Sequence, residues 1–368
     1  MNEPCGLYVH IPFCQAKCPY CDFYSKACNR DEIEHYVNYL VRQMEMYGKL
    51  YSDKKFDTLY IGGGTPSVVG TDSLFKIVER AIKSFTFLPF PEITVEMNPC
   101  SAKHIDFEKL RSVSVNRISL GVQSANENEL RLLGRIHNND DVIETVAKIH
   151  QAGIENISMD LMLGISAQTI FSLQNSIKFC IDNGAKHISA YLLKIEPDTP
   201  YQKLAPTLSL PDEDTQADFY EYMQKFLVEK GYRQYEISNF SLVGFESRHN
   251  LKYWNCDEYL GIGVSAHSLM NGKRFYFPRD MQSFYDGRTI DDGNGSTEQE
   301  YIMLRLRLSD GIRFQEYQNL FGKKFPERCL KTAQKYSRYG FVNLQKDRLS
   351  LTPKGFLLSN MIIAEMLE

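Results

Sequence analysis

The sequence lacks several features that would assign it to common classes of protein. It has no excess of basic residues, since its formal net charge is −4, and this argues against a nucleic-acid partner, which usually requires a basic face. No stretch approaches the roughly 20 apolar residues that a membrane-spanning helix needs. The opening residues, MNEPCGLYVHIP, lack the basic and apolar regions of a secretory signal. We therefore expect a cytoplasmic protein, with peripheral membrane association through a partner left open.

The cysteines do not form the pattern of a disulfide framework. There are 9 of them, an odd number, and three cluster at positions 14, 18 and 21 while the others are scattered. Disulfides are rare in the reducing cytosol, so clustered thiols there indicate a metal site instead. The chain is also long enough, at 368 residues, for one large barrel-type domain and a smaller one.

Short β-rich runs that alternate with helical stretches predict an α/β fold. The six runs cover residues 6–11, 57–63, 92–98, 117–123, 156–164 and 187–195. Unusual polar residues and glycines gather at their carboxyl ends, which is where parallel α/β folds bind ligands. We predict a partial (β/α)₆ TIM-type barrel over residues 1–235. An open doubly wound sheet is the alternative.

The alternation of β-rich and helical runs ends after this barrel. Residues 236–295 do not resemble further β–α units, and we interpret them as a connecting segment associated with the barrel. Residues 296–368 combine helical segments with two short β-like runs, FVNLQ and RLSLT. These runs predict a hairpin beside a helix. A smaller C-terminal domain, helical and winged-helix-like, is therefore expected.

The cysteine cluster carries the clearest chemical signal. Thiolates are the ligands of iron–sulfur clusters, and the three side chains of Cys14, Cys18 and Cys21 would occupy three corners of a [4Fe–4S] cube. The fourth iron would be free to bind the amino and carboxylate groups of S-adenosylmethionine (SAM). Zinc is the alternative, but structural zinc sites use four ligands, usually in two separated pairs. Nearby His10 lies on a predicted strand, so it is a poor candidate for a fourth ligand.

A CxxxCxxC motif in a first β–α loop resembles the radical SAM superfamily. The flanking residues, YVHIPFC and GGGTP (62–66), are more specific. They resemble the oxygen-independent coproporphyrinogen III oxidase family, which includes a heme-chaperone branch, HemW. The resemblance covers essentially the whole chain. It implies a [4Fe–4S] cluster, SAM and a radical SAM type of partial barrel.

The resemblance also implies a set of side chains and glycines that contact SAM. Taken singly, each of them could be a turn residue, a packed aromatic residue or an ordinary polar group. Asp160 is the hardest to explain in that way, because a carboxylate within an apolar strand needs partners. The implied residues are Tyr8, Gly63, Gly64, Thr65, Glu96, Gln123, Arg135 and Asp160.

Three features separate the two branches of this family. The oxidases have a fourth cysteine two residues after the third, where this chain has Phe23. They also have a longer N-terminal segment that covers the active site, and the thirteen residues before Cys14 lead us to expect no such lid. The third feature is an HNxxYW motif, formed here by His249, Tyr253 and Trp254 with their neighbours.

In the chaperone branch the HNxxYW motif is linked to heme. Imidazole is a common axial ligand of heme iron, and Tyr and Trp rings can stack on the macrocycle. The alternative is a structural histidine in a packed turn, with the single Trp as a core residue.

The resemblance therefore implies a heme chaperone that passes heme to an acceptor apo-hemoprotein. The chain would act as a monomer or homodimer and would bind no nucleic acid. Two enzymatic alternatives stay open, an oxygen-independent coproporphyrinogen III oxidase and a radical SAM methyltransferase. Phe23 and the short N-terminus argue against the oxidase, while reductive cleavage of SAM remains possible.

Overall fold

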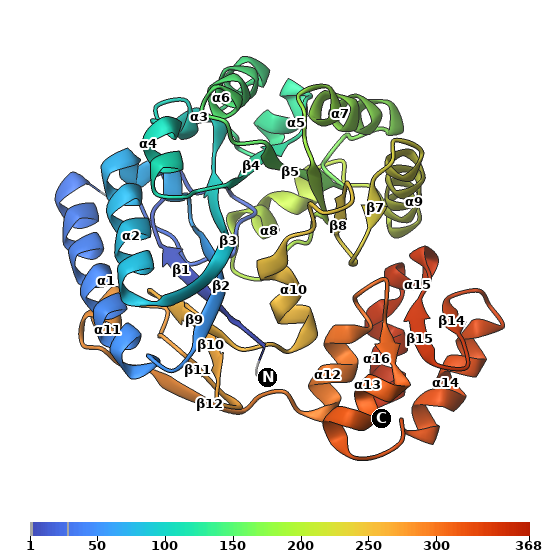
Figure 1. The fold of residues 1–368 in the computed structure, drawn as a ribbon. Coiled ribbons are helices and arrows are strands. Elements are labelled where there is room, and N and C mark those ends of the chain that lie inside the picture. The colour runs from blue at the N-terminus through green and yellow to red at the C-terminus, as the bar shows by residue number, and fades with distance from the viewer. Residues whose placement is uncertain (1–2, 28) are drawn as a thin grey trace.

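A computed structural model describes residues 3–27 and 29–368 of the chain. Its main feature is a 12-stranded sheet, shown in Figure 1. Its central part consists of parallel strands that pair in chain order. These strands are β1 (Cys5–Ile11), β2 (Lys55–Gly63), β3 (Thr86–Met97), β4 (Arg117–Gln123), β5 (Asn156–Leu163) and β6 (His187–Leu192).

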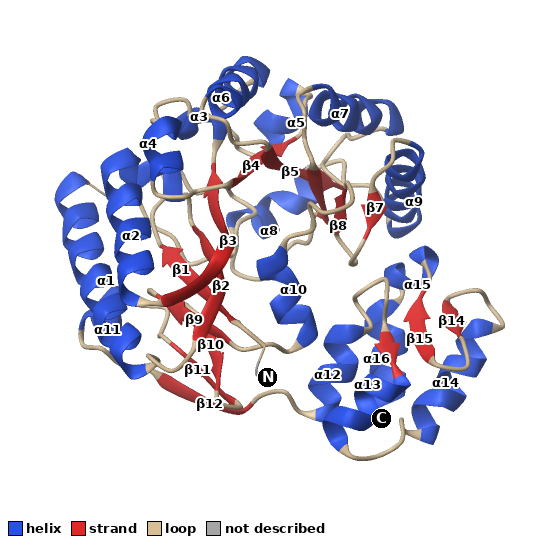
Figure 2. Cartoon of the chain, in the orientation of Figure 1, coloured by secondary structure: helices blue, strands red, loops and turns tan. Residues whose placement is uncertain are grey.

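Helices cover the outer side of the parallel strands (Figures 1 and 2). They are α1 (Arg30–Leu50), α2 (Gly70–Ser84), α3 (Pro99–Ala102), α4 (Phe107–Ser112), α5 (Glu127–Leu132), α6 (Asn139–Gln151), α7 (Ile170–Asp182) and α9 (Glu213–Glu229). Helix α8 (Pro200–Leu204) instead lies against the loop after β1, since Tyr201 N donates to Pro19 O (2.9 Å). Short 3₁₀ turns occupy Pro66–Val69 and Ala205–Thr207.

The alternation of side chains along each strand explains this arrangement. In β1, the side chains of Leu7, Val9 and Ile11 are completely buried in the apolar core. Tyr8 and His10 alternate with them and point to the other face, as the period of two in a strand requires. The sheet order is linear, from β12 at one edge to β7 at the other, so the barrel does not close. The predicted partial barrel is confirmed.

Both edges of the sheet are extended by segments beyond β6. Strands β7 (Arg233–Gln234) and β8 (Asn239–Ser241) form a hairpin beside β6. At the other edge, β9 (Tyr259–Ile262) runs parallel to β1. The edge continues in antiparallel order with β10 (His267–Met270), β11 (Lys273–Tyr276) and β12 (Ile290–Asn294).

The predicted connecting segment is thus largely part of the main sheet. Its strands are too short for their pattern to be recognised in the sequence, which is why no further β–α unit was expected there. The segment also contains α10 (Arg248–Asn255) and α11 (Met281–Tyr285). The proposed division between residues 235 and 236 falls inside the β7–β8 hairpin. It stays a prediction, as does the division between 295 and 296.

The last part of the chain builds a smaller unit around a 3-stranded sheet. Its hairpin of β14 (Val342–Leu344) and β15 (Arg348–Leu351) matches the two predicted β-like runs. The third strand is β13 (Ile312–Arg313), and the helices are α12 (Glu298–Arg305), α13 (Phe314–Phe321), α14 (Glu327–Ser337), α15 (Pro353–Leu357) and α16 (Ser359–Leu367). Helix α10 lies between this unit and the barrel (Figure 1).

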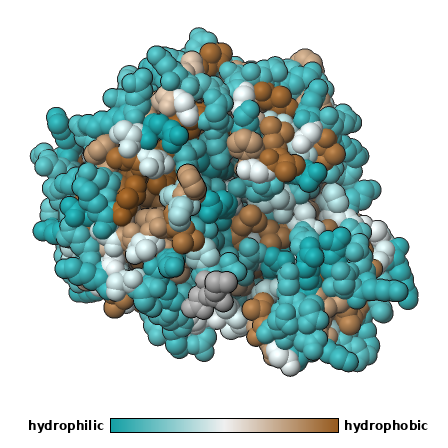
Figure 3. All heavy atoms as spheres, in the orientation of Figure 1, coloured by the Kyte–Doolittle hydropathy of each residue, from teal (hydrophilic) through white to brown (hydrophobic). Residues whose placement is uncertain are grey.

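The surface is mostly hydrophilic on the face shown in Figure 3. Apolar side chains gather there in separate patches rather than in one continuous band. Within the described residues, no helix is both long enough and apolar enough to cross a membrane.

Candidate functional site

The three clustered cysteines lie in the loop that follows β1. Two backbone hydrogen bonds close the base of this loop, from Cys14 N to Lys26 O (3.0 Å) and from Lys26 N to Pro12 O (2.9 Å). The Cys14 side chain is buried, whereas Cys18 and Cys21 are half-buried. All three are free thiols. The loop therefore has a fixed base and presents three possible metal ligands.

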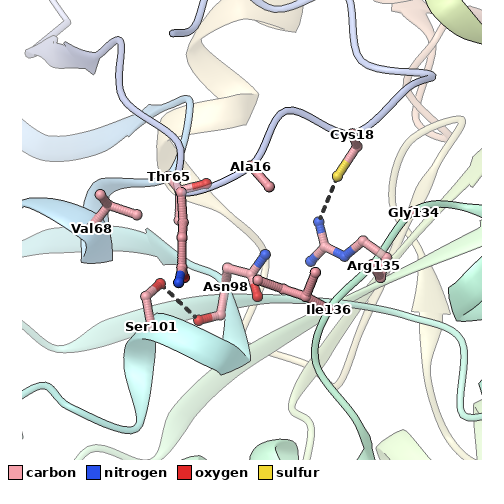
Figure 4. Close-up of a pocket in the computed structure, with 10 residues that line it drawn as sticks. Ala16, Cys18, Thr65, Val68, Asn98, Ser101, Gly134, Arg135 and Ile136 are labelled. Carbon is pink, nitrogen blue, oxygen red and sulfur yellow. Dashed lines mark hydrogen bonds between the residues drawn. The ribbon is translucent and has the colours of Figure 1, made fainter. Parts of the chain in front are cut away.

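Two of these thiols accept hydrogen bonds from residues that the resemblance implies in SAM binding. Thr65 Oγ1 donates to Cys14 Sγ (3.4 Å). Arg135 Nη1 donates to Cys18 Sγ (3.6 Å), as Figure 4 shows. Hydrogen bonds to the sulfur atoms are among the interactions by which proteins tune iron–sulfur clusters. The donors around this loop therefore fit a thiolate-bound cluster.

The arrangement of the thiols also bears on the zinc alternative. Among residues 3–27 and 29–368, no three His, Cys, Asp or Glu side chains converge closely enough to hold one metal ion. A cube keeps its thiolates apart, because each binds a different iron. A single zinc ion instead draws its ligands to about 2.3 Å from one point.

A small pocket opens beside the cysteine loop and brings three predicted residues together. Cys18, Thr65 and Arg135 line it (Figure 4). Asn98 and Ser101 also line the pocket, and Ser101 Oγ donates to Asn98 O (3.2 Å). Neither of these two was predicted. Asn98 directly follows β3, so the preference of ligands for the carboxyl ends of strands could have identified it.

Glu96 and the glycine loop after β2 form the next part of the site. Glu96 accepts hydrogen bonds from Tyr60 Oη (2.7 Å) and from Gly63 N (3.1 Å). A Cβ atom on Gly62 would lie 2.8 Å from Glu96 Oε2, so the close approach of this carboxylate requires glycine. Burial raises the pKa of Glu96 to about 7. The carboxyl group can therefore change its protonation state near neutral pH.

The side chains of Gln123 and Arg135 both lie close to Gly121, near the end of β4. A Cβ atom on Gly121 would lie 3.0 Å from Gln123 Nε2 and 3.1 Å from Arg135 Nη2. Arg135 Nη2 also donates to Gly121 O (2.6 Å), and its buried Nε has no hydrogen-bond partner. Gln123 adopts a left-handed backbone (φ 67°), which is uncommon for a side chain other than glycine and concentrates at functional sites.

Asp160 and Tyr8 complete the implied SAM residues. Asp160 accepts a hydrogen bond from Ser119 Oγ (3.4 Å), and burial raises its pKa. Tyr8 Oη is hydrogen-bonded to His10 Nδ1 (2.9 Å). Seven of the eight implied residues lie on β1 to β5 or directly after β2, and Arg135 lies in the loop between α5 and α6. Their contact with SAM itself stays a prediction.

The HNxxYW motif forms α10, which lies at the opposite, amino-terminal ends of the strands. The clearest sign of this is the hydrogen bond from Lys252 Nζ to Pro4 O (2.7 Å), just before β1. The start of the helix also reaches Glu92 of the long strand β3. Glu92 accepts hydrogen bonds from Arg248 N and His249 N (both 3.0 Å), so its carboxylate caps the start of α10. Ser247 contributes a second cap through its hydrogen bond from Asn250 N (3.4 Å). The helix is therefore anchored to the barrel by a carboxylate that the sequence did not reveal.

His249 is completely buried and both of its ring nitrogens are hydrogen-bonded. Nδ1 pairs with Thr58 Oγ1 (2.8 Å) and Nε2 with Tyr253 Oη (2.9 Å). Burial lowers the pKa of His249 to about 3, so the imidazole is neutral, as a metal ligand must be. Ligation of heme iron would require one of these hydrogen bonds to break. It stays a prediction, as do the heme contacts of Tyr253 and Trp254, both half-buried.

Four rings link the motif to the SAM residues, and we call them the aromatic column: Tyr8, Tyr60, His249 and Tyr253. Tyr60 stacks on His249 with ring centroids 5.1 Å apart and an interplanar angle of 24°. Tyr8 and Tyr60 stack at 6.4 Å, and Tyr253 meets His249 edge-on at 5.2 Å. The two predicted sites are therefore in physical contact through the barrel interior.

Comparison with protein families gives two matches, one in the barrel and one in the C-terminal unit. Residues 8–180 match the model of the Radical SAM superfamily. Residues 299–358 match the model of the HemN C-terminal domain. The first match contains the cysteine loop and the eight implied SAM residues. Membership of the superfamily implies a [4Fe–4S] cluster and SAM, and the thiols and donors described above fit these two groups.

Comparison with curated proteins gives matches over the full length. The chain is 31% identical over 376 residues to a protein of Lactococcus lactis named "Heme chaperone HemW", covering 100% of this chain and 98% of that protein. A Bacillus subtilis protein of the same name is 31% identical and covers 98% of this chain and 99% of its own. Among solved structures, coproporphyrinogen III oxidase (HemN) from Escherichia coli superposes with a TM-score of 0.84 over 99% of this chain and 90% of that chain. Its 20% identity supports a shared fold and no more.

Proposed function

This chain belongs to the heme chaperone HemW family, and we propose on that premise that it binds heme and passes it to an acceptor hemoprotein. The observation that carries the proposal is the position of the HNxxYW helix. It lies at the amino-terminal ends of the strands that carry the implied SAM residues, and the aromatic column joins the two. The motif residues His249 and Tyr253 are thus in ring contact with Tyr60, which bonds to Glu96, and this supports the proposal.

The cysteine loop and the strand ends have separate tasks in this proposal. Cys14, Cys18 and Cys21 would hold the cluster, and a bound cluster would supply an electron to SAM. Arg135 and Thr65 would stabilise the thiolates through the hydrogen bonds that they already make. Glu96, Gln123 and Asp160, together with Tyr8, Gly63 and Gly64, would bind and orient SAM by its polar groups.

The heme would bind at α10, with His249 as the axial ligand. Its imidazole is neutral and its Nε2 is engaged only by Tyr253 Oη. In the tautomer that carries its proton on Nδ1, movement of that one hydroxyl would free a lone pair on Nε2 for iron. Tyr253 and Trp254 would then be available to contact the porphyrin ring, in line with the tendency of aromatic side chains to stack on flat ligands.

We also propose a setting for this activity. The acceptor is an apo-hemoprotein, and the chain works in the cytoplasm as a monomer or homodimer without binding nucleic acid. Delivery to a membrane-bound acceptor would require only peripheral association.

A heme-transfer assay tests the proposal. Heme-loaded protein with an intact cluster is mixed with an apo-hemoprotein, and transfer is followed by the visible spectrum and the recovered activity of the acceptor. Free heme at the same concentration is the control for spontaneous uptake. We expect faster or more complete reconstitution from the loaded protein.

The enzymatic alternatives are decided by product analysis under anaerobic conditions. Incubation with coproporphyrinogen III, SAM and a reductant is expected to give no protoporphyrinogen. Formation of that product would contradict the proposal and identify an oxidase. Transfer of a labelled methyl group from SAM to a substrate would instead indicate a methyltransferase.

A further inference from the structure

Tyr60 touches both predicted sites. Its hydroxyl donates to Glu96 (2.7 Å), an implied SAM residue. Its ring stacks on His249 at 5.1 Å, the proposed heme ligand. Tyr60 belongs to neither motif and was not singled out in the sequence. It lies midway along β2, where its side chain points into the barrel.

The environment of His249 defines a closed state of the motif helix. In this state Thr58 and Tyr253 occupy both ring nitrogens, and no part of the His249 side chain is exposed. An iron-binding state must differ from it, since a ligating nitrogen cannot keep its hydrogen bond. The stacked ring of Tyr60 packs against the closed imidazole, so whatever fixes Tyr60 also favours the closed state.

We propose that Tyr60 couples the two sites, so that SAM bound at Glu96 holds His249 in its closed state and opposes heme ligation. The coupling rests on the proposed function for its heme half, whereas its SAM half depends only on the radical SAM site. In this scheme SAM binding is a signal for the release of heme to the acceptor.

The direction of the coupling follows from the hydrogen bond between Tyr60 and Glu96. SAM is a cation, and a cation beside Glu96 favours the ionised carboxylate. A hydrogen bond to an ionised acceptor is about twice as strong as one to a neutral acceptor. The Tyr60 ring is then held more firmly against His249. Because coupling between two ligands is reciprocal, heme must weaken SAM binding by the same factor.

Hydrogen exchange tests the SAM half of the proposal without heme. Cluster-reconstituted protein is compared with and without SAM, and exchange of the amides of α10 is measured by mass spectrometry. We expect SAM to slow their exchange several-fold in the parent and to have no effect on them in Tyr60→Phe. The substitution keeps the ring and removes only the hydroxyl. Unchanged exchange of α10 in the parent would overturn the inference whatever the protein does with heme.

Heme titrations test the complete coupling. The heme dissociation constant is measured with and without saturating SAM in the parent, in Tyr60→Phe and in Tyr220→Phe. Tyr220 is the matched control, because it donates a similar buried hydrogen bond (2.8 Å, to Ile237 O) and contacts neither Glu96 nor His249. Coupling between sites typically changes an affinity by about 5- to 150-fold. We therefore expect SAM to raise the heme dissociation constant at least fivefold in the parent and in Tyr220→Phe.

In Tyr60→Phe, SAM should change the heme dissociation constant by less than about twofold. Cluster absorbance and melting temperature establish that each variant is folded. Heme binding that SAM does not affect, or full coupling in folded Tyr60→Phe, would overturn the inference and leave the proposed function intact. A failure of the parent to bind heme at all would overturn both.

Discussion

Among single residues, Glu96 has the environment with the clearest chemical consequence. It is a carboxyl group held inside a barrel by a tyrosine hydroxyl and a backbone amide. Burial raises its pKa from 4.5 to about 7, which means that the neutral form predominates in mildly acidic solution. Only the ionised form accepts hydrogen bonds at both oxygens and attracts a cation.

We therefore predict that SAM binds more tightly as the pH rises from 6 to 8. Below a pH of about 7, part of the SAM binding energy must remove the proton from Glu96, and above it this cost disappears. Calorimetric titration of the reconstituted protein across this range measures the effect. In Glu96→Gln the affinity should be lower and independent of pH over the same range. A parent affinity that is flat or falls with pH would contradict the assignment.

The cysteine loop gives a second prediction at this scale. Cys14→Ser should abolish formation of the cluster, because only two of its four irons would then keep a protein thiolate. Iron content and visible absorbance after anaerobic reconstitution measure this. Cys100→Ser is the matched control, since Cys100 is a half-buried free thiol near the loop but lies outside the CxxxCxxC motif. Retention of a full cluster by the first variant would contradict the ligand assignment.

The sequence predicted the cysteines because their spacing is a property of consecutive residues. It could not predict Tyr60 or Glu92, because their roles depend on how distant strands align. Tyr60 pairs in register with Thr94 of β3, which brings its hydroxyl close to Glu96. Glu92 contacts α10, although more than 150 residues of sequence separate the two. Neither position carries a local pattern that indicates such a partner.

Among the elements, α10 begins at a buried carboxylate from a distant strand. Glu92 is only 6% exposed and accepts from two backbone amides at the start of the helix. We predict that Glu92→Gln lowers stability, because an amide has one acceptor oxygen where the carboxylate has two. A hydrogen bond to a charged group contributes about 1.5–3 kcal/mol, so the loss should be of that order in denaturant unfolding.

The control for this variant is Glu79→Gln. Glu79 forms an exposed ion pair with Lys83 on α2, and such pairs contribute about 0–1 kcal/mol. The control should therefore unfold nearly as the parent does. Equal stability of Glu92→Gln and the parent would show that the cap is not required to hold α10.

A further prediction concerns the closed state of the same helix. Tyr253→Phe removes the hydroxyl that occupies Nε2 of His249 and keeps the ring. The closed state then loses a buried hydrogen bond, whereas the iron-bound state loses nothing. We expect heme affinity to rise about fivefold or more, equivalent to roughly 1 kcal/mol for one hydrogen bond. A fall in affinity, measured by absorbance titration, would show that the hydroxyl itself takes part in heme binding.

Most of the elements could be predicted, and the failures share a cause. The six parallel strands and the longer helices between them, such as α1, α2, α6, α7 and α9, follow clear periodic patterns. Strand β9, in contrast, has 4 residues, and its parallel pairing with β1 joins segments far apart in the chain. The alternation in so short a run is too weak to distinguish a strand from a loop.

For the whole molecule, the notable property is a barrel with a polar interior. The outward side chains of β1 to β6 form the apolar core with the helices, and the inward ones include acids, histidines and tyrosines. Composition alone predicted a core of sufficient size but could not show which polar residues share one enclosed space. That grouping follows only from the parallel register of the strands.

The central claim is that the protein binds heme through His249, and a heme titration of the cluster-reconstituted protein tests it most directly. The parent is compared with His249→Ala and with His104→Ala, which removes an exposed histidine on the outer side of the barrel. Melting temperatures confirm that both variants are folded. We predict one heme per chain for the parent and the control, and binding at least tenfold weaker for His249→Ala. Equal heme affinity in all three proteins would contradict the assignment of His249, and no heme binding by the parent would contradict the proposed function itself.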